Sequence, residues 1–328
     1  MVKKTINLFL LFASYWISRL IGKPVHWGMP FSLSVEPVNY CNLRCPQCPT
    51  GMWQLTRPKG FMDLDTYRQL IVQQSGTLSY LILYFQGEPY MHPQFTEFAR
   101  IAKQLGIFSA VSTNGHFLSE ELARLTVESG LGRLIVSVDG ASQEVYEKYR
   151  VGGNLLTVLD GMKRIVFWKK KLGVSHPLLE MQFIVFGVNE SDVEKMKSLK
   201  TEIAADRLVL KTAQIYDHQN GSEFLTSIKG LSRYEKMEEG GFRIKNKLAN
   251  HCWRMWSGAV VTEDGKVLPC CFDKNADHVM GDIHQQSFAE IWKGDPYKEF
   301  RRKISVSRAQ IPMCKNCTEG TEAKDKIF

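Results

Sequence analysis

Residues 31–48 read FSLSVEPVNYCNLRCPQC, a short apolar strand pattern followed directly by Cys41, Cys45 and Cys48. Thiolates are the usual protein ligands of iron–sulfur clusters, and a loop of this length can wrap three irons of a cubane cluster. Three protein ligands leave the fourth iron open to chelate a small molecule and to pass it an electron. The alternatives are unliganded buried cysteines and zinc, which would want a fourth ligand and usually shows paired C-x2-C spacing.

Strand-like and helix-like segments alternate from Phe31 onward. The strand candidates are Phe31–Pro37, Tyr80–Phe85, Phe108–Ser112, Leu134–Val138, Glu180–Phe186 and Arg207–Thr212, and the helix candidates are Asp65–Gln74, Gln94–Leu105, Ser119–Ser129, Leu155–Lys171 and Ser191–Glu202. Such alternation is typical of a parallel sheet with right-handed crossovers. The units are too few for a full eight-stranded barrel, so the sequence predicts an α/β fold, a partial (β/α)6 TIM-like barrel with its chemistry at the carboxyl ends of the strands.

The alternation is lost over residues 216–250, which we interpret as a bridging segment. Beyond it, residues 258–268 predict a hairpin, because Asp264-Gly265 suits a tight turn. Ser287–Trp292 and Pro296–Ile304 predict short helices. We therefore expect an N-terminal segment over 1–30, the barrel core over 31–215, the bridge over 216–250, a small C-terminal α+β domain over 251–320 and a tail over 321–328.

The composition is that of an ordinary globular chain, since 44% of the 328 residues are hydrophobic and 23% are charged. The 42 Lys and Arg residues outnumber the 34 Asp and Glu residues, and the net charge of +8 is spread along the chain, which is typical of a solvated basic surface. We expect no nucleic acid partner. The cysteines fall in two groups, with none between Cys48 and Cys252, and this favours metal sites in a reducing compartment over a disulfide scaffold.

The N-terminal residues combine basic and apolar side chains. Lys3 and Lys4 precede the run INLFLLF at residues 6–12, and further basic residues follow, but no small-residue cleavage site stands out. The stretch to residue 21 predicts an amphipathic helix that packs on the body of the protein or lies on a membrane surface, with a removed signal peptide as the third alternative. No apolar run is long enough for a spanning helix.

The C-x3-C-x2-C loop after the first strand of a βα array resembles that of the radical S-adenosylmethionine (SAM) superfamily. This resemblance implies a partial (β/α)6 barrel and a [4Fe–4S] cluster whose open iron binds the amino and carboxylate groups of SAM. It also implies the superfamily's chemistry, in which reductive cleavage of SAM yields methionine and a 5′-deoxyadenosyl radical that abstracts hydrogen from the substrate.

Polar residues at later strand ends agree with the same family pattern. Gln86-Gly87-Glu88-Pro89 resembles the Gly-Gly-Glu motif that receives the methionine amino group, and Arg150 lies where related enzymes carry an arginine on the SAM carboxylate. The resemblance thus implies a SAM site made by Gly87, Glu88, Ser112, Asn114, Ser137, Asp139 and Arg150. One position departs from the pattern: Gln47 stands where many members carry an aromatic residue, so adenine would contact the backbone or a later apolar residue instead.

The second cysteine group resembles the auxiliary-cluster domains called SPASM, or Twitch in their shortened form. Cys252 and Cys270 form the pattern C-x12-G-x4-C, and a C-x2-C follows near the C-terminus. The resemblance implies that Cys252, Cys270, Cys314 and Cys317 bind one auxiliary [4Fe–4S] cluster, which serves electron transfer or structural support. Cys271 is the spare thiol; the glycine spacing favours Cys270, although the pair leaves the choice open. A zinc knuckle with the same thiolates is the alternative.

We therefore expect an enzyme that uses an external flavodoxin- or ferredoxin-like one-electron reductant, in the cytoplasm and peripheral to the membrane if the N-terminal helix binds lipid. Its substrate is an unknown peptide or small molecule, and its reaction a net two-electron oxidation or a peptide or protein maturation step. Tyr84, His92, His116 and Asp217 are candidates to face the substrate, although each is more often a structural polar residue, and no catalytic base is assigned. The rival interpretation is a non-catalytic iron–sulfur or zinc protein that carries electrons or acts as a scaffold; it needs neither the Gly87-Glu88-Pro89 motif nor Arg150.

Overall fold

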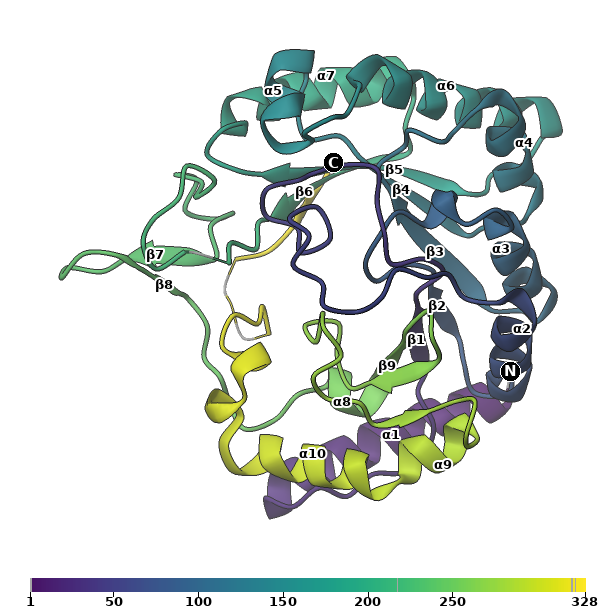
Figure 1. The fold of residues 1–328 in the computed structure, drawn as a ribbon, viewed down its shortest axis with the longest axis vertical. Helices are drawn as coiled ribbons and strands as arrows, with labels where there is room; N and C mark the ends of the chain where they lie inside the picture. The colour runs from purple at the N-terminus through teal and green to yellow at the C-terminus, as the bar shows by residue number, and fades with distance from the viewer. Residues whose placement is uncertain (1, 217, 320, 322) are drawn as a thin grey trace. The chain divides into compact units, whose positions relative to one another are not determined.

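The computed structural model describes residues 2–216, 218–319, 321 and 323–328. The chain divides into two compact units, and each unit is built from separate segments of the chain (Figure 1). The first unit comprises Met1–Tyr40, Leu55–Ala110 and Leu248–Cys317, and the second comprises Cys41–Gln54, Val111–Lys247 and Thr318–Phe328. The three cysteines of the first group therefore belong to the second unit, and the C-terminal cysteines belong to the first.

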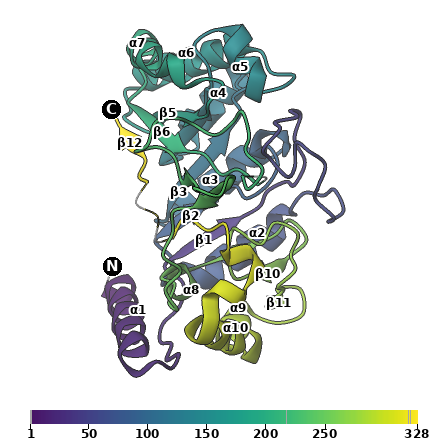
Figure 2. The same ribbon diagram turned by 90° about the vertical axis from the view of Figure 1, so that its left-hand side faces the viewer.

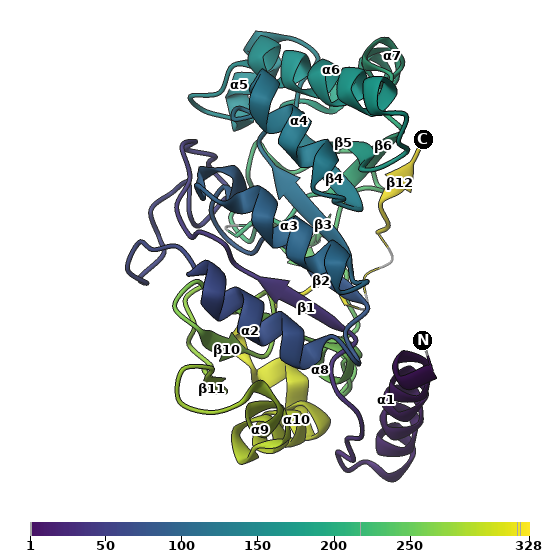
Figure 3. The same cartoon turned by 90° about the vertical axis from the view of Figure 1, so that its right-hand side faces the viewer.

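The first unit is built on parallel strands that follow one another in chain order. They are β1 (Ser32–Val35), β2 (Tyr80–Ile82) and β3 (Phe108–Thr113). The last residues of β3, from Val111 onward, belong to the second unit. Helices α2 (Leu64–Gln74) and α3 (Phe95–Gln104) lie over one face of β1 and β2 (Figure 3). The 3-10 helix η1 (Pro89–Met91) follows β2.

Local signals explain where these helices begin and how they pack. The Asp63 carboxylate accepts a hydrogen bond from the Thr66 amide at 2.8 Å and so caps α2. Tyr67 on α2 is fully buried, and its hydroxyl donates to the Phe98 carbonyl of α3 at 2.8 Å. The buried side chains of β1 and β2, Leu33, Val35 and Leu81, complete a core between the helices and the strands.

The C-terminal region belongs to the sheet of the first unit. Its elements are α8 (Arg254–Ser257), β9 (Gly258–Val261), β10 (Lys266–Leu268), β11 (Gly281–Asp282), α9 (Phe288–Lys293), α10 (Asp295–Ser307), η3 (Arg308–Gln310) and η4 (Pro312–Cys314). Strand β9 runs parallel to β1, so that Leu33 faces Ala259, while β10 pairs antiparallel with β9. The strand order in this unit is β11-β10-β9-β1-β2-β3.

The N-terminal helix α1 (Val2–Ile21) also belongs to the first unit. It buries Leu11 and Tyr15, and the Tyr15 ring lies 5.3 Å from that of Trp253 and 5.6 Å from that of Trp256. The predicted amphipathic helix is thus confirmed, and one of its faces packs on the protein. Within the described residues, no helix combines the length and hydropathy that crossing a bilayer requires.

The second unit carries the remaining parallel strands, β4 (Arg133–Ser137), β5 (Leu178–Val185) and β6 (Arg207–Thr212), with β12 (Lys326–Ile327) antiparallel to β6. Its helices are α4 (Glu120–Glu128), α5 (Gln143–Tyr149), α6 (Leu155–Leu172), α7 (Val193–Ile203) and the 3-10 turn η2 (Glu190–Asp192). Figure 2 shows α4, α6 and α7 on the same side of β5 and β6. A hairpin of β7 (Tyr234–Lys236) and β8 (Phe242–Ile244) completes the unit.

The predicted fold class is confirmed, because all six expected strands form in parallel pairs and all five expected helices are present. Several short elements were not predicted, including two in the second unit. Helix α5 has only 7 residues, too few for a clear period, and the hairpin of β7 and β8 lies inside the segment expected to be an irregular bridge. The predicted C-terminal hairpin is β9 and β10, but its pairing with β1 was not expected.

Candidate metal centres and cofactor site

The loop of the first cysteine group is fixed by its own backbone. The Cys48 amide donates to the Cys45 carbonyl at 3.1 Å, and the Leu43 amide donates to the Cys41 sulfur at 3.4 Å. Gly51 lies so close that a Cβ there would stand 2.6 Å from the Cys45 nitrogen. A glycine is therefore required for the loop to fold back on itself.

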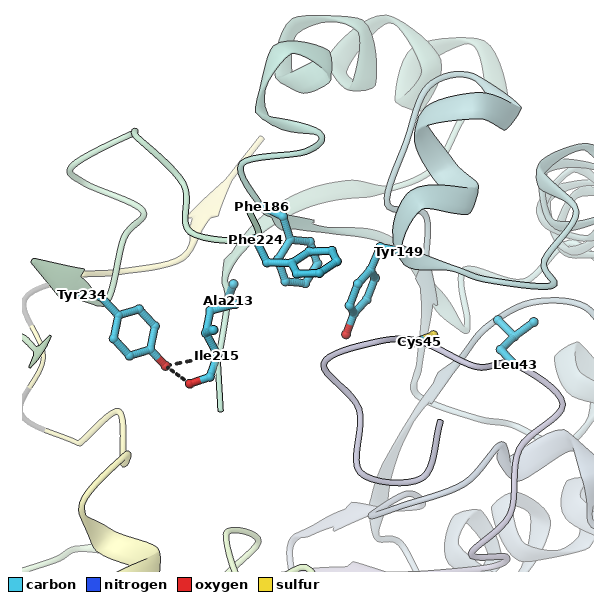
Figure 4. Close-up of a cluster of buried hydrophobic side chains, with 8 residues drawn as sticks. All are labelled: Leu43, Cys45, Tyr149, Phe186, Ala213, Ile215, Phe224 and Tyr234. Atoms are coloured by element: carbon cyan, nitrogen blue, oxygen red, sulfur yellow. Dashed lines mark hydrogen bonds between the residues drawn. The ribbon is translucent and has the colours of Figure 1, made fainter. Parts of the chain in front are cut away.

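An apolar cluster of the second unit supports this loop. It comprises Leu43, Cys45, Tyr149, Phe186, Ala213, Ile215, Phe224 and Tyr234 (Figure 4). The rings of Tyr149 and Phe186 lie 4.2 Å apart, and Figure 4 shows the Tyr149 hydroxyl directed toward the loop that carries Cys45. Burial raises the pKa of Cys45 to about 11, although Arg150 opposes this. The thiol is therefore neutral by itself and becomes a thiolate when a cation ligates it.

A buried ion pair stands beside Cys45. Arg150 follows α5, and its Nε donates to Asp139 Oδ2 at 2.6 Å, while its Nη1 donates to the Cys45 sulfur at 3.8 Å. The other carboxylate oxygen of Asp139 accepts from the Ile184 amide at 2.6 Å. Burial raises the pKa of Asp139 and Arg150 lowers it; burial alone would lower the pKa of Arg150, but Asp139 raises it well above its ordinary value. Asp139 thus holds a cation against the cysteine loop.

Asn114, at the end of β3, also contacts the cysteine loop. Its Nδ2 donates to Asn42 Oδ1 at 2.7 Å and to the Cys41 sulfur at 3.6 Å. Hydrogen bonds of this kind tune the potential of iron–sulfur clusters. Of the two predicted serines, Ser112 is half-buried in β3, and Ser137 is the buried last residue of β4.

The Gly87-Glu88 motif is anchored to the residue that precedes the first cysteine. The Glu88 amide donates to the Tyr40 carbonyl at 2.9 Å, and Glu88 Oε1 accepts from the Tyr90 amide at 3.1 Å. Gly87 has a φ of +72°, and a Cβ there would meet the Val38 carbonyl oxygen at 2.5 Å, so no other residue fits. The structure thus keeps the predicted residues in two places: Gly87 and Glu88 in the first unit, and Asn114, Asp139 and Arg150 beside the cysteines in the second.

The departure at Gln47 has a structural counterpart. Gln47 Oε1 accepts a hydrogen bond from the Tyr216 amide at 3.1 Å, so this side chain holds the segment that follows β6. Two other polar candidates have structural roles: His92 Nε2 lies 2.9 Å from the Met62 carbonyl, and His116 Nε2 accepts from the Asn154 amide at 2.8 Å. Burial lowers the pKa of both histidines. Asp217 lies outside the described residues.

The second cysteine group surrounds one small cavity in the first unit. Cys252, Cys270, Cys314 and Cys317 all line it, together with Arg308, which donates from Nη2 to the Cys317 sulfur at 3.2 Å. In the part of the chain that the structure describes, no three Cys, His, Asp or Glu side chains converge on a single ion position. A ring of thiols around a cavity suits a cubane cluster, in which each thiolate binds its own iron.

Cys271 faces a different cavity. That cavity has a volume of about 280 Å³ and is lined by β1, β2 and β9 and by Arg254, Cys271 and Lys274. Tyr84 and Cys270 line it as well. The Lys274 ammonium lies 5.0 Å from the centre of the Phe85 ring, and Arg254 Nη1 donates to the Cys271 sulfur at 3.9 Å. The hydrogen bond from Cys270 lowers the pKa of Cys271, and Lys274 and Arg254 act in the same direction. No local motif marks these two cations in the sequence.

A buried charge network, also without a sequence motif, joins the barrel strands to the C-terminal hairpin of the first unit. Arg57 Nη1 and Nη2 donate to the Glu36 carboxylate at 2.8 and 2.9 Å, and Nη1 also donates to Glu263 Oε2 at 2.5 Å. Asn39 Nδ2 donates to Glu263 Oε1 at 2.5 Å, and the Gln86 amide donates to Glu36 Oε1 at 3.1 Å. This network, Arg57–Glu36–Glu263, therefore reaches the residue at which the Gly87-Glu88 motif begins.

The chain belongs to the radical SAM superfamily. The family model for that superfamily matches residues 35–199, and the model for the SPASM iron–sulfur cluster-binding domain matches residues 252–318. The protein is thus an enzyme of this superfamily, and its two domains imply iron–sulfur clusters and SAM as cofactors. The family resemblance predicted from the cysteine loops is confirmed.

Two named relatives match the chain in sequence, and one solved structure matches its fold. The chain is 24% identical, over 87% of its length and 86% of the relative's, to the tungsten-containing aldehyde ferredoxin oxidoreductase cofactor-modifying protein of Pyrococcus furiosus. It is 25% identical, over 81% of its length and 77% of the relative's, to the PqqA peptide cyclase of Gluconobacter oxydans. The structure of Streptococcus suis SuiB bound to SAM matches with a TM-score of 0.62 and 12% identity, over 94% of this chain and 76% of that one.

Proposed function

We propose that this protein cleaves SAM reductively and uses the resulting radical to abstract hydrogen from a peptide or small-molecule substrate, in a net two-electron oxidation or a maturation step. The observation that carries this proposal is that Cys41, Cys45 and Cys48 lie on one loop beside the buried apolar cluster, and that Arg150 and Asn114 donate hydrogen bonds to sulfurs of this loop. When bound, a [4Fe–4S] cluster and SAM would supply the 5′-deoxyadenosyl radical chemistry. A simple electron carrier has no need of a buried Arg150 directed at the ligand loop.

The residues of the second unit divide into ligands, contacts and positioning groups. Cys41, Cys45 and Cys48 would hold the cluster, and Arg150 is suited to the SAM carboxylate because a guanidinium binds carboxylates with paired donors. Both carboxylate oxygens of Asp139 already accept hydrogen bonds, from Arg150 and from Ile184. We therefore assign Asp139 to the positioning of Arg150, and Ser112, Asn114 and Ser137 to the ribose and amino-acid parts of SAM.

The first unit carries the remaining residues that we assign to cofactors. Gly87 and Glu88 are assigned to the SAM amino group, since a carboxylate accepts hydrogen bonds from an ammonium. Cys252, Cys270, Cys314 and Cys317 are assigned to one auxiliary [4Fe–4S] cluster. We assign residues 31–215 to the radical SAM core, 216–250 to the bridge and 251–320 to the auxiliary domain.

The cavity beside Cys271 is the proposed substrate site. Its lining is largely apolar, and Arg254 and Lys274 add positive charge, so it suits a substrate with an apolar body and an anionic group. The PqqA peptide cyclase acts, by its name, on a peptide, which supports a peptide as one form of such a substrate. A flavodoxin- or ferredoxin-like protein in the cytoplasm would supply the electron.

Reductive cleavage of SAM by the anaerobically reconstituted protein tests the proposal. With dithionite and SAM, the wild type is expected to release 5′-deoxyadenosine and methionine, as measured by liquid chromatography and mass spectrometry. Replacing Cys41, Cys45 and Cys48 with Ala should remove the signal, whereas Cys271→Ala should retain it. A wild type that holds its clusters and binds SAM, yet releases no 5′-deoxyadenosine, would favour the electron-carrier interpretation instead.

The two neighbouring thiols Cys270 and Cys271 are expected to differ in metal binding. Cys270 lines the cavity that Cys252, Cys314 and Cys317 also line, and Cys271 does not. Cys270→Ala should therefore lower the iron content from about eight to about four per chain, and Cys271→Ala should leave it near eight. Iron and labile sulfide, measured after anaerobic reconstitution, report the outcome. Circular dichroism of both variants checks that the fold is retained. Loss of iron in Cys271→Ala alone would reverse the assignment.

A further inference from the structure

Helix α1 turns polar side chains toward the protein. Its buried residues include Asn7, Ser14 and Ser18. Asn7 exchanges two hydrogen bonds with the backbone of Met29, at 2.8 and 2.7 Å, and the Val25 amide donates to Ser18 Oγ at 2.8 Å. Asn7 and Ser18 therefore attach the segment that returns from α1 to the sheet, and the inward face is shared between polar side chains and the apolar Leu11 and Tyr15.

The opposite face of α1 is apolar and exposed. Val2, Ile6, Phe9, Trp16 and Leu20 are 73%, 54%, 71%, 49% and 83% exposed. Their spacing of i, i+4, i+7, i+14 and i+18 places them in one stripe along the helix. The inward face buries only Leu11 and Tyr15 among its large apolar side chains, while this stripe stays exposed, so the stripe fits a second apolar environment.

The charged side chains of the N-terminal segment all have one sign. Lys3, Arg19 and Lys23 are exposed, and the first acidic residue of the sequence is Glu36. The Arg19 guanidinium lies 4.5 Å from the centre of the Trp16 ring, so positive charge stands directly beside the apolar face. Figures 2 and 3 show α1 at the edge of the first unit.

We infer that α1 docks the enzyme on an anionic phospholipid bilayer. The helix lies in the plane of the interface, with the stripe in the acyl boundary and the basic side chains among the headgroups. A second copy of the chain is a poorer occupant, because it would place the same basic residues against one another. Residues 2–35 supply no carboxylate to pair with them.

Vesicle flotation of the reconstituted full-length protein tests this surface. The wild type should float with vesicles that contain phosphatidylglycerol and float much less with pure phosphatidylcholine. Phe9→Ser with Leu20→Ser should weaken binding by roughly tenfold or more. Lys3→Gln and Lys23→Gln should each weaken it by about fivefold at low salt. Leu156→Ser is the matched control, because Leu156 is 71% exposed on α6 and lies outside the stripe.

The substituted side chains are exposed, so the variants should fold and a change in flotation reports on membrane binding. Thermal melts check their folding, and SAM cleavage should be unchanged in all of them. Absence of flotation by the wild type, or equal flotation of the Phe9/Leu20 variant, would overturn the inference. The inference would also be overturned if light scattering showed that the wild type is a dimer and that the Phe9/Leu20 variant is a monomer. Equal binding to both kinds of vesicle would refute the role of charge.

Discussion

Arg150→Ala is expected to abolish measurable SAM binding and to lower the free energy of unfolding by about 3–5 kcal/mol. The side chains of Arg150 and Asp139 are only 12% and 0% exposed. Removal of the guanidinium leaves a buried carboxylate without its cation, which is costlier than the loss of the pair as a whole. Equilibrium dialysis of SAM measures the loss of binding, and urea denaturation measures the loss of stability.

Two further variants separate stability from cofactor binding. Arg124→Ala removes a surface ion pair with Glu128, whose side chains are 39% and 34% exposed, and should change stability by less than about 1 kcal/mol. The double variant Arg150→Ala with Asp139→Ala should recover part of the stability but none of the SAM binding. Wild-type SAM affinity in a folded Arg150→Ala protein would contradict the assigned role of this residue.

Arg57→Met is expected to be equally damaging, through the network Arg57–Glu36–Glu263. It leaves two buried carboxylates without a cation and should cost about 3–5 kcal/mol of unfolding free energy at pH 8. Burial raises the pKa of Glu36 well above its ordinary value of 4.5, the neighbouring Glu263 raises it further, and Arg57 lowers it. Without Arg57 the pKa of Glu36 therefore rises further.

The upward shift of the Glu36 pKa determines how the loss of stability in Arg57→Met depends on pH. A carboxyl group whose pKa is higher in the folded state binds more protons when folded, so stability falls as pH rises from 4.5 through the folded-state pKa. The defect should accordingly be smaller at pH 5 than at pH 8, as measured by urea denaturation at each pH. Arg302→Met, at an exposed ion pair with Glu299, is the control and should show neither effect. A defect that is the same at both pH values would contradict the network's charge state.

Much of the fold could be predicted because its signals are local. A strand buried on both faces reads as an apolar run, as at residues 134–136, and Ser119 and Gly173 mark helix ends by the chemistry of their caps. Helix α5 could not be found this way, because its buried residues are only Tyr146 and Tyr149. The pairing of β9 with β1 joins residues more than two hundred positions apart, for which no periodic pattern exists.

In the candidate site, too, features with a local sequence signal could be predicted and contacts between distant residues could not. The cysteines and the Gly87-Glu88 motif are visible because their chemistry depends on short spacings. Arg57 and Glu263 are 206 positions apart in the chain, and nothing near either residue indicates that they meet. The hydrogen bonds of Asp139 to Arg150 and to the Ile184 amide were likewise hidden, because these partners lie 11 and 45 positions away along the chain.

The parallel pairing of β9 with β1 bears on how such a chain could evolve. Without the residues after 247, β1 would become an edge strand with unpaired amides and carbonyls from Ser32 to Val35, and the carboxylate of Glu36 would lose its neighbour Glu263. The SPASM region is thus a structural member of the first unit rather than a detachable module. Recombination could not add or remove it without rebuilding the strand that leads to the first cysteine, so the two regions are expected to be inherited together.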